Sequence, residues 1–176
     1  MNIAFAGDPN DPDNWPRLAA LAPGAAALAS AADKAGVADP MIRVMNDLGS
    51  LLCARAQYAS AEPLLRRALA IAEASKGGRH PYLAAALNNM AGLLHATNRL
   101  DEAEPLYRRT LVIDEARLGK DHPEIAIDLN NLAEVLRATN RPGEAEPPMR
   151  RALAIEEASL GNGHPTVATH LNTLAA

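Results

Sequence analysis

Apolar residues recur along this chain at the spacing of amphipathic helices. Leu83, Leu87, Met90 and Leu94 follow one another in steps of three or four residues, and a second series starts at Leu100 after a short polar stretch. Such steps place apolar side chains on one face of a helix. The pattern therefore predicts two antiparallel helix pairs without strands, near 83–96 with 100–117 and near 125–138 with 142–159.

The helix pair belongs to a unit that repeats along the chain. Four markers recur every 42 residues. They are a Glu-Pro pair, an Arg-Arg pair, a His-Pro pair, and an Asn that follows Leu or Met. They stand at 62–63, 104–105 and 146–147; at 66–67, 108–109 and 150–151; at 80–81, 122–123 and 164–165; and at Asn46, Asn88, Asn130 and Asn172. Independent markers in one phase predict a repeat array. We expect N-terminal leader and capping helices over 1–37, repeats over 38–79, 80–121 and 122–163, and the first helix of a truncated fourth repeat over 164–176.

Residues at the helix ends agree with this division. Pro123 suits the first position of a helix, because that position needs no amide donor. Gly119 suits the residue after a helix, and Asn98 accepts a left-handed conformation in the turn within the unit. Asp101 with Glu104 has the spacing of a capping box. Glu and Arg four residues apart predict ion pairs on an outer, solvated face.

Composition supports an all-α protein and argues against several functions. Of 176 residues, 38 are Ala and 24 are Leu, against one Phe, one Trp and three Tyr, and Ala and Leu favour helices. The formal net charge is -4, so we expect no nucleic-acid partner and no membrane partner. Cys53, the single cysteine, cannot form an intramolecular disulfide, and no signal peptide is evident. We expect a cytoplasmic protein.

Candidate catalytic and metal-binding chemistry is sparse. The His-Pro pairs lie one repeat apart, too far for one ion, so we interpret them as turn residues. Cys53 has no activating His or Lys near it in sequence. The Gly161-Asn162-Gly163 stretch follows a helix, whereas a phosphate-binding loop precedes one. We predict that the chain is not an enzyme and needs no cofactor or metal.

The motifs His-Pro-x-x-Ala-x-x-Leu-Asn-Asn-Leu/Met-Ala, Asn-Arg-x-x-Glu-Ala-Glu-Pro and Arg-Arg-x-Leu-x-Ile-x-Glu resemble the 42-residue tetratricopeptide repeat of kinesin light chains and their bacterial relatives. The resemblance covers Asp39 to the C-terminus and implies a right-handed α-solenoid of helix-turn-helix repeats. Residues 1–37 resemble, less specifically, the lead-in to the repeats of NB-ARC/STAND proteins. Richness in Ala and Arg is typical of a GC-rich bacterial chain.

The resemblance also implies a peptide-binding groove, lined by the first helix of each repeat. Its carboxamides could bond the backbone of an extended peptide whatever the peptide's side chains. The alternative is that one Asn of each pair only fixes helix stacking, and Asn89 and Asn131 are the favoured contacts. The groove set is Arg43, Asn46, Asn88, Asn89, His95, Asn130, Asn131, Glu134 and Arg137, with Asp47, Ser50, Gly92, Ile127 and Asn172 along the same faces.

The predicted function is a non-catalytic interaction module that binds a peptide or protein segment in this groove. Kinesin light chains prefer acidic cargo peptides with tryptophan, but Arg43 and Arg137 are balanced here by Asp47 and Glu134, so we do not assume the same cargo. The basic clamp of co-chaperone repeats is absent. Two alternatives stay open: a sensor fragment of a larger STAND-type signalling ATPase, and a scaffold that self-associates through an uncapped C-terminal helix bearing Val167, Leu171 and Leu174.

Overall fold

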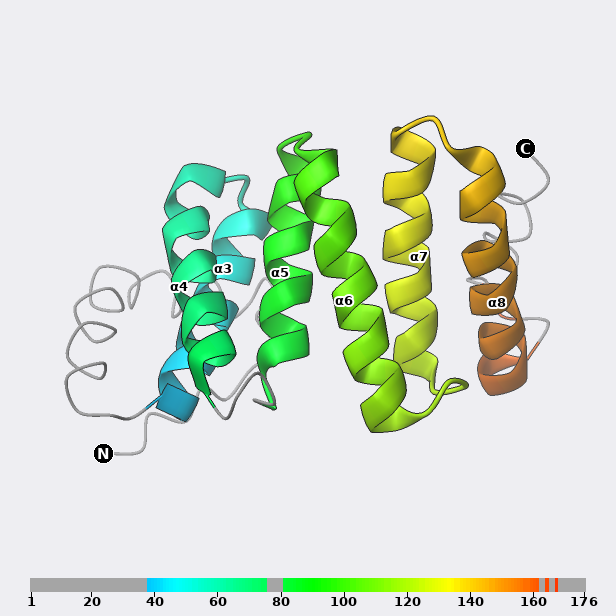
Figure 1. The fold of residues 1–176 in the computed structure, drawn as a ribbon, viewed down its shortest axis with the longest axis horizontal. Helices are drawn as coiled ribbons and strands as arrows, with labels where there is room; N and C mark the ends of the chain where they lie inside the picture. Colours follow the sequence, from blue (N-terminus) through cyan, green and yellow to red (C-terminus); the bar gives the residue numbers. More distant parts are fainter. Residues whose placement is uncertain (1–37, 76–80, 162–163, 165–166, 168–176) are drawn as a thin grey trace. The chain divides into compact units, whose positions relative to one another are not determined.

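The computed structural model describes residues 38–75, 81–161, 164 and 167, and within these residues all regular structure is helical. The expected leader over 1–37 and most of the expected helix over 164–176, including Leu171, Asn172 and Leu174, lie outside the described residues. Six helices occur in the described part: α3 (Ala38–Ala54), α4 (Tyr58–Ala74), α5 (Leu83–Ala96), α6 (Leu100–Leu118), α7 (Pro123–Ala138) and α8 (Pro142–Leu160) (Figure 1). The four helices predicted from periodicity are confirmed, with α7 starting slightly earlier than predicted, at Pro123.

The helices α3, α5 and α7 end in the same turn. After α7, the amide of Asn140 donates to the carbonyl of Arg137 at 2.9 Å, and the amide of Arg141 donates to the carbonyl of Leu136 at 2.8 Å. These are the two bonds of a Schellman motif, which needs a left-handed residue. That residue is Ala56, Asn98 or Asn140, with φ of 56°, 58° and 60°. The left-handed conformation predicted for Asn98 is confirmed, and Asn140 adopts it at the equivalent position.

The start of α7 shows why His and Pro occur together. His122 is the N-cap, and its Nδ1 accepts a hydrogen bond from the amide of Glu124 at 3.2 Å, while Pro123 occupies the first turn. Gly119, with φ of 91°, ends α6 as predicted. At this junction the His-Pro pair is a capping device, which agrees with its interpretation as a turn element.

The capping box predicted at the start of α6 was wrong. Arg99 is the N-cap of this helix, without a side-chain capping bond. Glu104 instead accepts hydrogen bonds from Arg108 at 2.9 Å and from Arg141 at 2.6 Å. Two guanidinium groups therefore hold the carboxylate that the box would have used. The predicted outer ion pairs are confirmed at Glu62–Arg66 (2.6 Å), Glu104–Arg108 (2.8 Å) and Glu146–Arg150 (2.6 Å).

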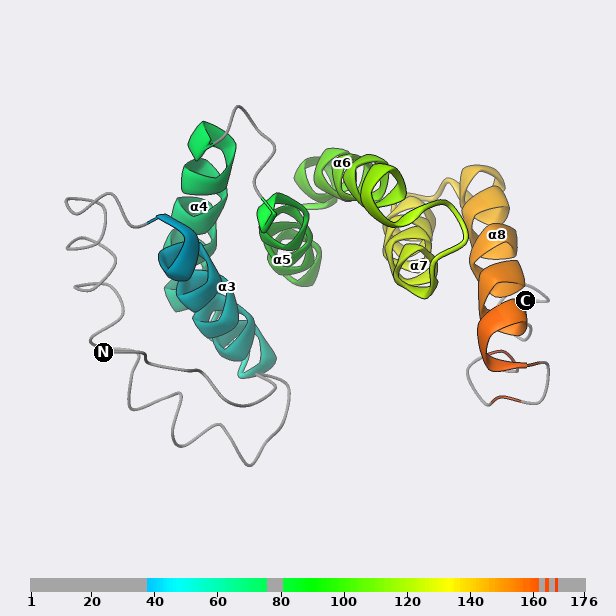
Figure 2. The same ribbon diagram turned by 90° about the horizontal axis from the view of Figure 1, so that it is seen from below.

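The chain divides into two compact units, 1–93 and 94–176, with the boundary inside α5. In the first unit, α3 packs along α4, and both views show the two helices side by side (Figures 1 and 2). Leu65 of α4 is fully buried. A Cβ added to Gly49 of α3 would lie 2.4 Å from Leu65 Cδ2, so the glycine allows this close approach.

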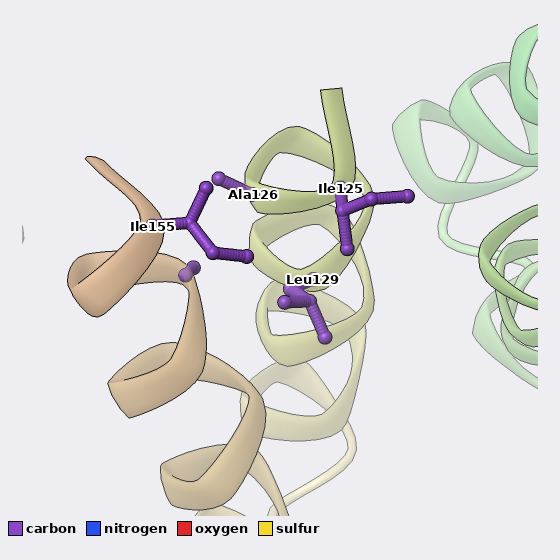
Figure 3. Close-up of a cluster of buried hydrophobic side chains, with 5 residues drawn as sticks. Ile125, Ala126, Leu129 and Ile155 are labelled. Carbon is purple, nitrogen blue, oxygen red and sulfur yellow. The ribbon is translucent and has the colours of Figure 1, made fainter. Parts of the chain in front are cut away.

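In the second unit, α7 packs against α8 on one side and against α6 on the other. Ile125, Ala126 and Leu129 of α7 form a buried cluster with Ala152 and Ile155 of α8, and Leu111 of α6 packs against it. Figure 3 shows Ile155 directed toward Ala126, whereas Ile125 points away from α8. Because α7 is covered from two sides, only a narrow strip of its surface faces solvent.

A polar link joins α6 and α8. Arg151 of α8 pairs with Glu115 of α6 and donates to the carbonyl of Lys120 at 2.6 Å. Together with the Arg141–Glu104 contact at 2.6 Å, this link ties the second helices of successive predicted repeats. These partly exposed bonds fix the relative orientation of the two helices more than they add stability.

Candidate peptide-binding surface

The solvent-facing side of α7 carries the most varied chemistry of the predicted groove. Ile127, Asn131 and Glu134 follow one another at helical spacing, so they share one helix face, and Arg137 lies beside them. Ile127 is 59% exposed, which is unusual for a large aliphatic side chain. Glu134 and Arg137 are exposed and Asn131 is half-buried. We call these four residues the α7 strip.

Asn130 has a structural partner. Its Nδ2 donates to Oε1 of Glu156 on α8 at 3.1 Å, and Glu156 is buried. The bond joins the two helices of one predicted repeat. This bond supports the stacking alternative for Asn130, and we leave Asn130 out of the proposed contacts.

On α3 the equivalent face carries Arg43, Asp47 and Asn46. Arg43 is exposed, and its Nε lies 3.8 Å from Oδ2 of Asp47. Burial raises the pKa of Asp47, and the positive charge of Arg43 partly offsets that rise. Asn46 is only 5% exposed and its Oδ1 has no hydrogen-bond partner. Ala72 stands in this repeat where Glu156 stands in the third, so the carboxylate partner is missing, and Asn46 is too buried to contact a ligand directly.

The predicted contacts on α5 are accessible in part. Asn88, Asn89 and His95 are each half-buried, and Asn88 lies at the position of Asn46 and Asn130. Asn89 lies at the position of Asn131, on the middle of the helix face. In α7 the structure separates the two asparagines: Asn130 bonds to Glu156 of α8, and Asn131 lies on the outer strip. In α3, Asn46 is likewise buried.

Glu134 acts on a buried phenol. Tyr107 of α6 is buried, and burial followed by the negative charge of Glu134 raises its pKa to about 12. The phenol therefore stays neutral at physiological pH, and Glu134 is exposed.

Two further observations concern the thiol and the possible metal ligands. Burial raises the pKa of the half-buried Cys53 thiol, which opposes thiolate formation. Across 38–75 and 81–161, no three His, Cys, Asp or Glu residues come together as a metal site. None of the helices α3–α8 is long and apolar enough to cross a membrane.

The comparisons agree with the helical architecture. The tetratricopeptide repeat family model matches residues 40–116 and 82–158, two overlapping stretches that start one repeat apart and together span well over half of the chain. The comparison with curated proteins finds no match.

Solved structures with kinesin light chain-like repeats are similar in fold. The nearly identical TPR-like repeats of a Podosopora anserina kinesin light chain-like protein match at 18% identity, with a TM-score of 0.67, over 97% of this chain and 86% of that one. A single-substitution variant matches at 19% identity with a TM-score of 0.67, over 92% and 85%. BtubC (BKLC) from P. vanneervenii matches at 22% identity with a TM-score of 0.68. The alignment covers 92% of the present chain and 63% of BtubC. The predicted fold class, an all-α helical-repeat solenoid, is confirmed.

Proposed function

Because the chain belongs to the tetratricopeptide repeat family, we propose that it is a non-catalytic interaction module that binds an extended peptide along the first helices of its repeats. Repeats of this family generally bind protein partners, and their folds typically serve as scaffolds without catalysis. The binding of a peptide on this face, and the residues that contact it, are the proposal.

The α7 strip is the observation that supports this function. An aliphatic side chain that is 59% exposed beside a carboxamide and two charged groups offers both apolar burial and hydrogen bonding to one ligand. The carboxamide of Asn131 has a donor and an acceptor, which match the alternating groups of a peptide backbone. Burying Ile127 beneath a ligand would contribute about 1–2 kcal/mol.

The charges of the strip favour a ligand that is not uniformly acidic. Glu134 and Arg137 form no ion pair with each other or with another described residue. A peptide with a basic and an acidic residue around an apolar one would satisfy both groups. This differs from a purely acidic cargo, which Glu134 would repel.

The test is a peptide-array screen followed by affinity measurement on the selected peptide. The variant Asn89→Ala/Asn131→Ala removes two neutral hydrogen-bonding groups, each worth about 1 kcal/mol, so we expect roughly 30-fold weaker binding with unchanged circular dichroism. A second variant, Glu134→Lys/Arg137→Glu, keeps the net charge and should change which peptides bind. The control is Val112→Ala, because Val112 is an exposed apolar residue on α6.

Equal losses for Val112→Ala and for the double Asn variant would show that the ligand does not occupy the α7 strip. Loss of folding in the double Asn variant would assign Asn89 and Asn131 to helix stacking instead. The alternatives, a STAND-type sensor fragment and a self-associating scaffold, remain predictions. Light scattering of the chain over a range of concentrations tests the second one.

A further inference from the structure

A buried carboxyl group lies where α6 meets α7, outside the α7 strip. Asp128 of α7 is only 6% exposed, and its Oδ2 has no hydrogen-bond partner. Asp114 of α6 is also buried and accepts two bonds from Arg117, at 3.0 Å from Nε and 2.8 Å from Nη2. The same Nη2 donates to Oε2 of Glu124 at 3.2 Å. Two carboxyl groups, those of Asp114 and Glu124, thus share the guanidinium of Arg117, whereas Asp128 makes no hydrogen bond to it.

This cluster has no counterpart in the preceding repeat. The equivalent of Asp128 in the preceding repeat is Ala86, which is fully buried, so the repeat itself does not require a polar residue there. The equivalents of Asp114, Arg117 and Glu124 one repeat earlier are Ala72, Ser75 and Tyr82. An uncharged junction is therefore compatible with the repeat, and the carboxyl cluster is an addition to it.

We propose that Asp128 makes the contact between α6 and α7 a pH-responsive joint. A neutral Asp128 is not repelled by the neighbouring carboxylates, so it packs in the interface without an electrostatic penalty from them. An ionised Asp128 is buried close to the charge of the buried Asp114 and of the exposed Glu124, and the repulsion loosens the packing of the two helices. The joint is therefore tighter in mildly acidic than in mildly alkaline solution.

The electrostatic surroundings of Asp128 support this behaviour. Burial first, and then the charges of Asp114 and Glu124, raise its pKa to about 7, against the opposing effect of Arg117. On α8, which packs on another side of α7, Glu156 is bonded to Asn130 and Arg151 to Glu115.

The direction of the effect follows from proton binding. In the unfolded chain the Asp128 carboxyl has its ordinary pKa of 3.8, so between about pH 4 and 7 the folded chain holds a proton that the unfolded chain has lost. Stability therefore falls as the pH rises through this range. Above pH 7 both states are ionised, and the loss is complete.

The test follows the carboxyl group and the stability of the whole chain together. In the wild type, the side-chain carboxyl ¹³C resonance of Asp128 should titrate with a midpoint near pH 7. Between pH 5.5 and 8.5 the thermal midpoint should fall by about 5 °C more than that of Asp128→Asn. Asp128→Ala, with the residue of the preceding repeat, should show the same reduced pH response as Asp128→Asn.

The matched control is Asp121→Asn, which removes an exposed carboxylate near the same junction and should keep the wild-type pH response. Hydrogen exchange at both pH values should show the largest loss of protection in α6 and α7. A carboxyl midpoint below pH 5, or the same pH response in Asp128→Asn as in the wild type, would overturn the proposal. Since the titration is measured on the wild type, it decides even where a variant folds poorly.

Discussion

Ala56 occupies a backbone conformation that its side chain disfavours, and this makes the turn after α3 the sharpest test of the fold. Its φ is 56°, and its amide and that of Gln57 donate to Cys53 and Leu52 at 2.8 Å each. The same turn uses Asn98 and Asn140 in the later repeats. A left-handed residue with a Cβ costs about 1–2 kcal/mol, which Gly avoids and Asn partly avoids. A glycine also raises the conformational entropy of the unfolded chain, which offsets about 0.4–1 kcal/mol of this gain.

We therefore expect Ala56→Gly to stabilise the chain by about 0.5–1 kcal/mol, and Ala56→Asn to act in the same direction. The matched control is Ala70→Gly at an exposed, helical position of α4, which should destabilise by about 0.5–1 kcal/mol. Urea unfolding followed by circular dichroism measures both. The same chemical change should thus have opposite signs at two sites. A loss of stability in Ala56→Gly as large as that in Ala70→Gly would refute the argument from backbone conformation.

Two further predictions concern helix packing and capping. Gly49→Ala should cost about 1–3 kcal/mol, because the new Cβ would lie 2.4 Å from Leu65. The control Gly143→Ala in α8, whose new Cβ would meet nothing within 4 Å, should stabilise the chain by up to about 1 kcal/mol. If thermal unfolding showed stability changes of the same sign for both variants, the packing argument would be contradicted. His122→Ala should cost about 1 kcal/mol by removing the N-cap of α7, and His122→Asn, a good N-cap, should recover most of it. Failure of the Asn variant to recover would show that the histidine acts through something other than capping.

The sequence could predict the helices because two independent signals coincide at their ends. Apolar periodicity stops where turn residues begin, as at Asn98 and Gly119, and both residues have positive φ. Ala56 forms the same turn without a local signal, so only the repeat phase could have identified it. The capping box failed because Glu104 meets Arg141, a contact between residues distant in the sequence that local spacing cannot reveal.

The candidate site was harder to predict, because burial depends on the neighbouring helix. Asn46 and Asn130 occupy equivalent positions in the repeat, yet their surroundings differ because Ala72 of α4 stands where α8 has Glu156. Asp128 looks like a surface residue in the sequence, but packing of α6 buries it. In contrast, the exposure of Ile127, Glu134 and Arg137 follows directly from the helical phase of α7.

A comparison of the variants Asn130→Ala and Asn46→Ala measures how much the asparagine at this repeat position contributes to packing. Asn130→Ala removes the hydrogen bond to the buried carboxylate of Glu156, and a bond to a charged group is worth about 1.5–3 kcal/mol. Asn46→Ala breaks no such bond with a carboxylate, since Ala72 stands at the equivalent position, so it should cost about 1–2 kcal/mol less. In the double variant Asn130→Ala/Glu156→Ala, the unpaired carboxylate is gone, and urea unfolding should show a favourable coupling of about 1 kcal/mol between the two sites. Additive effects in this cycle would mean that the Asn130–Glu156 bond does not stabilise the repeat, and Asn130 would return to the set of proposed ligand contacts.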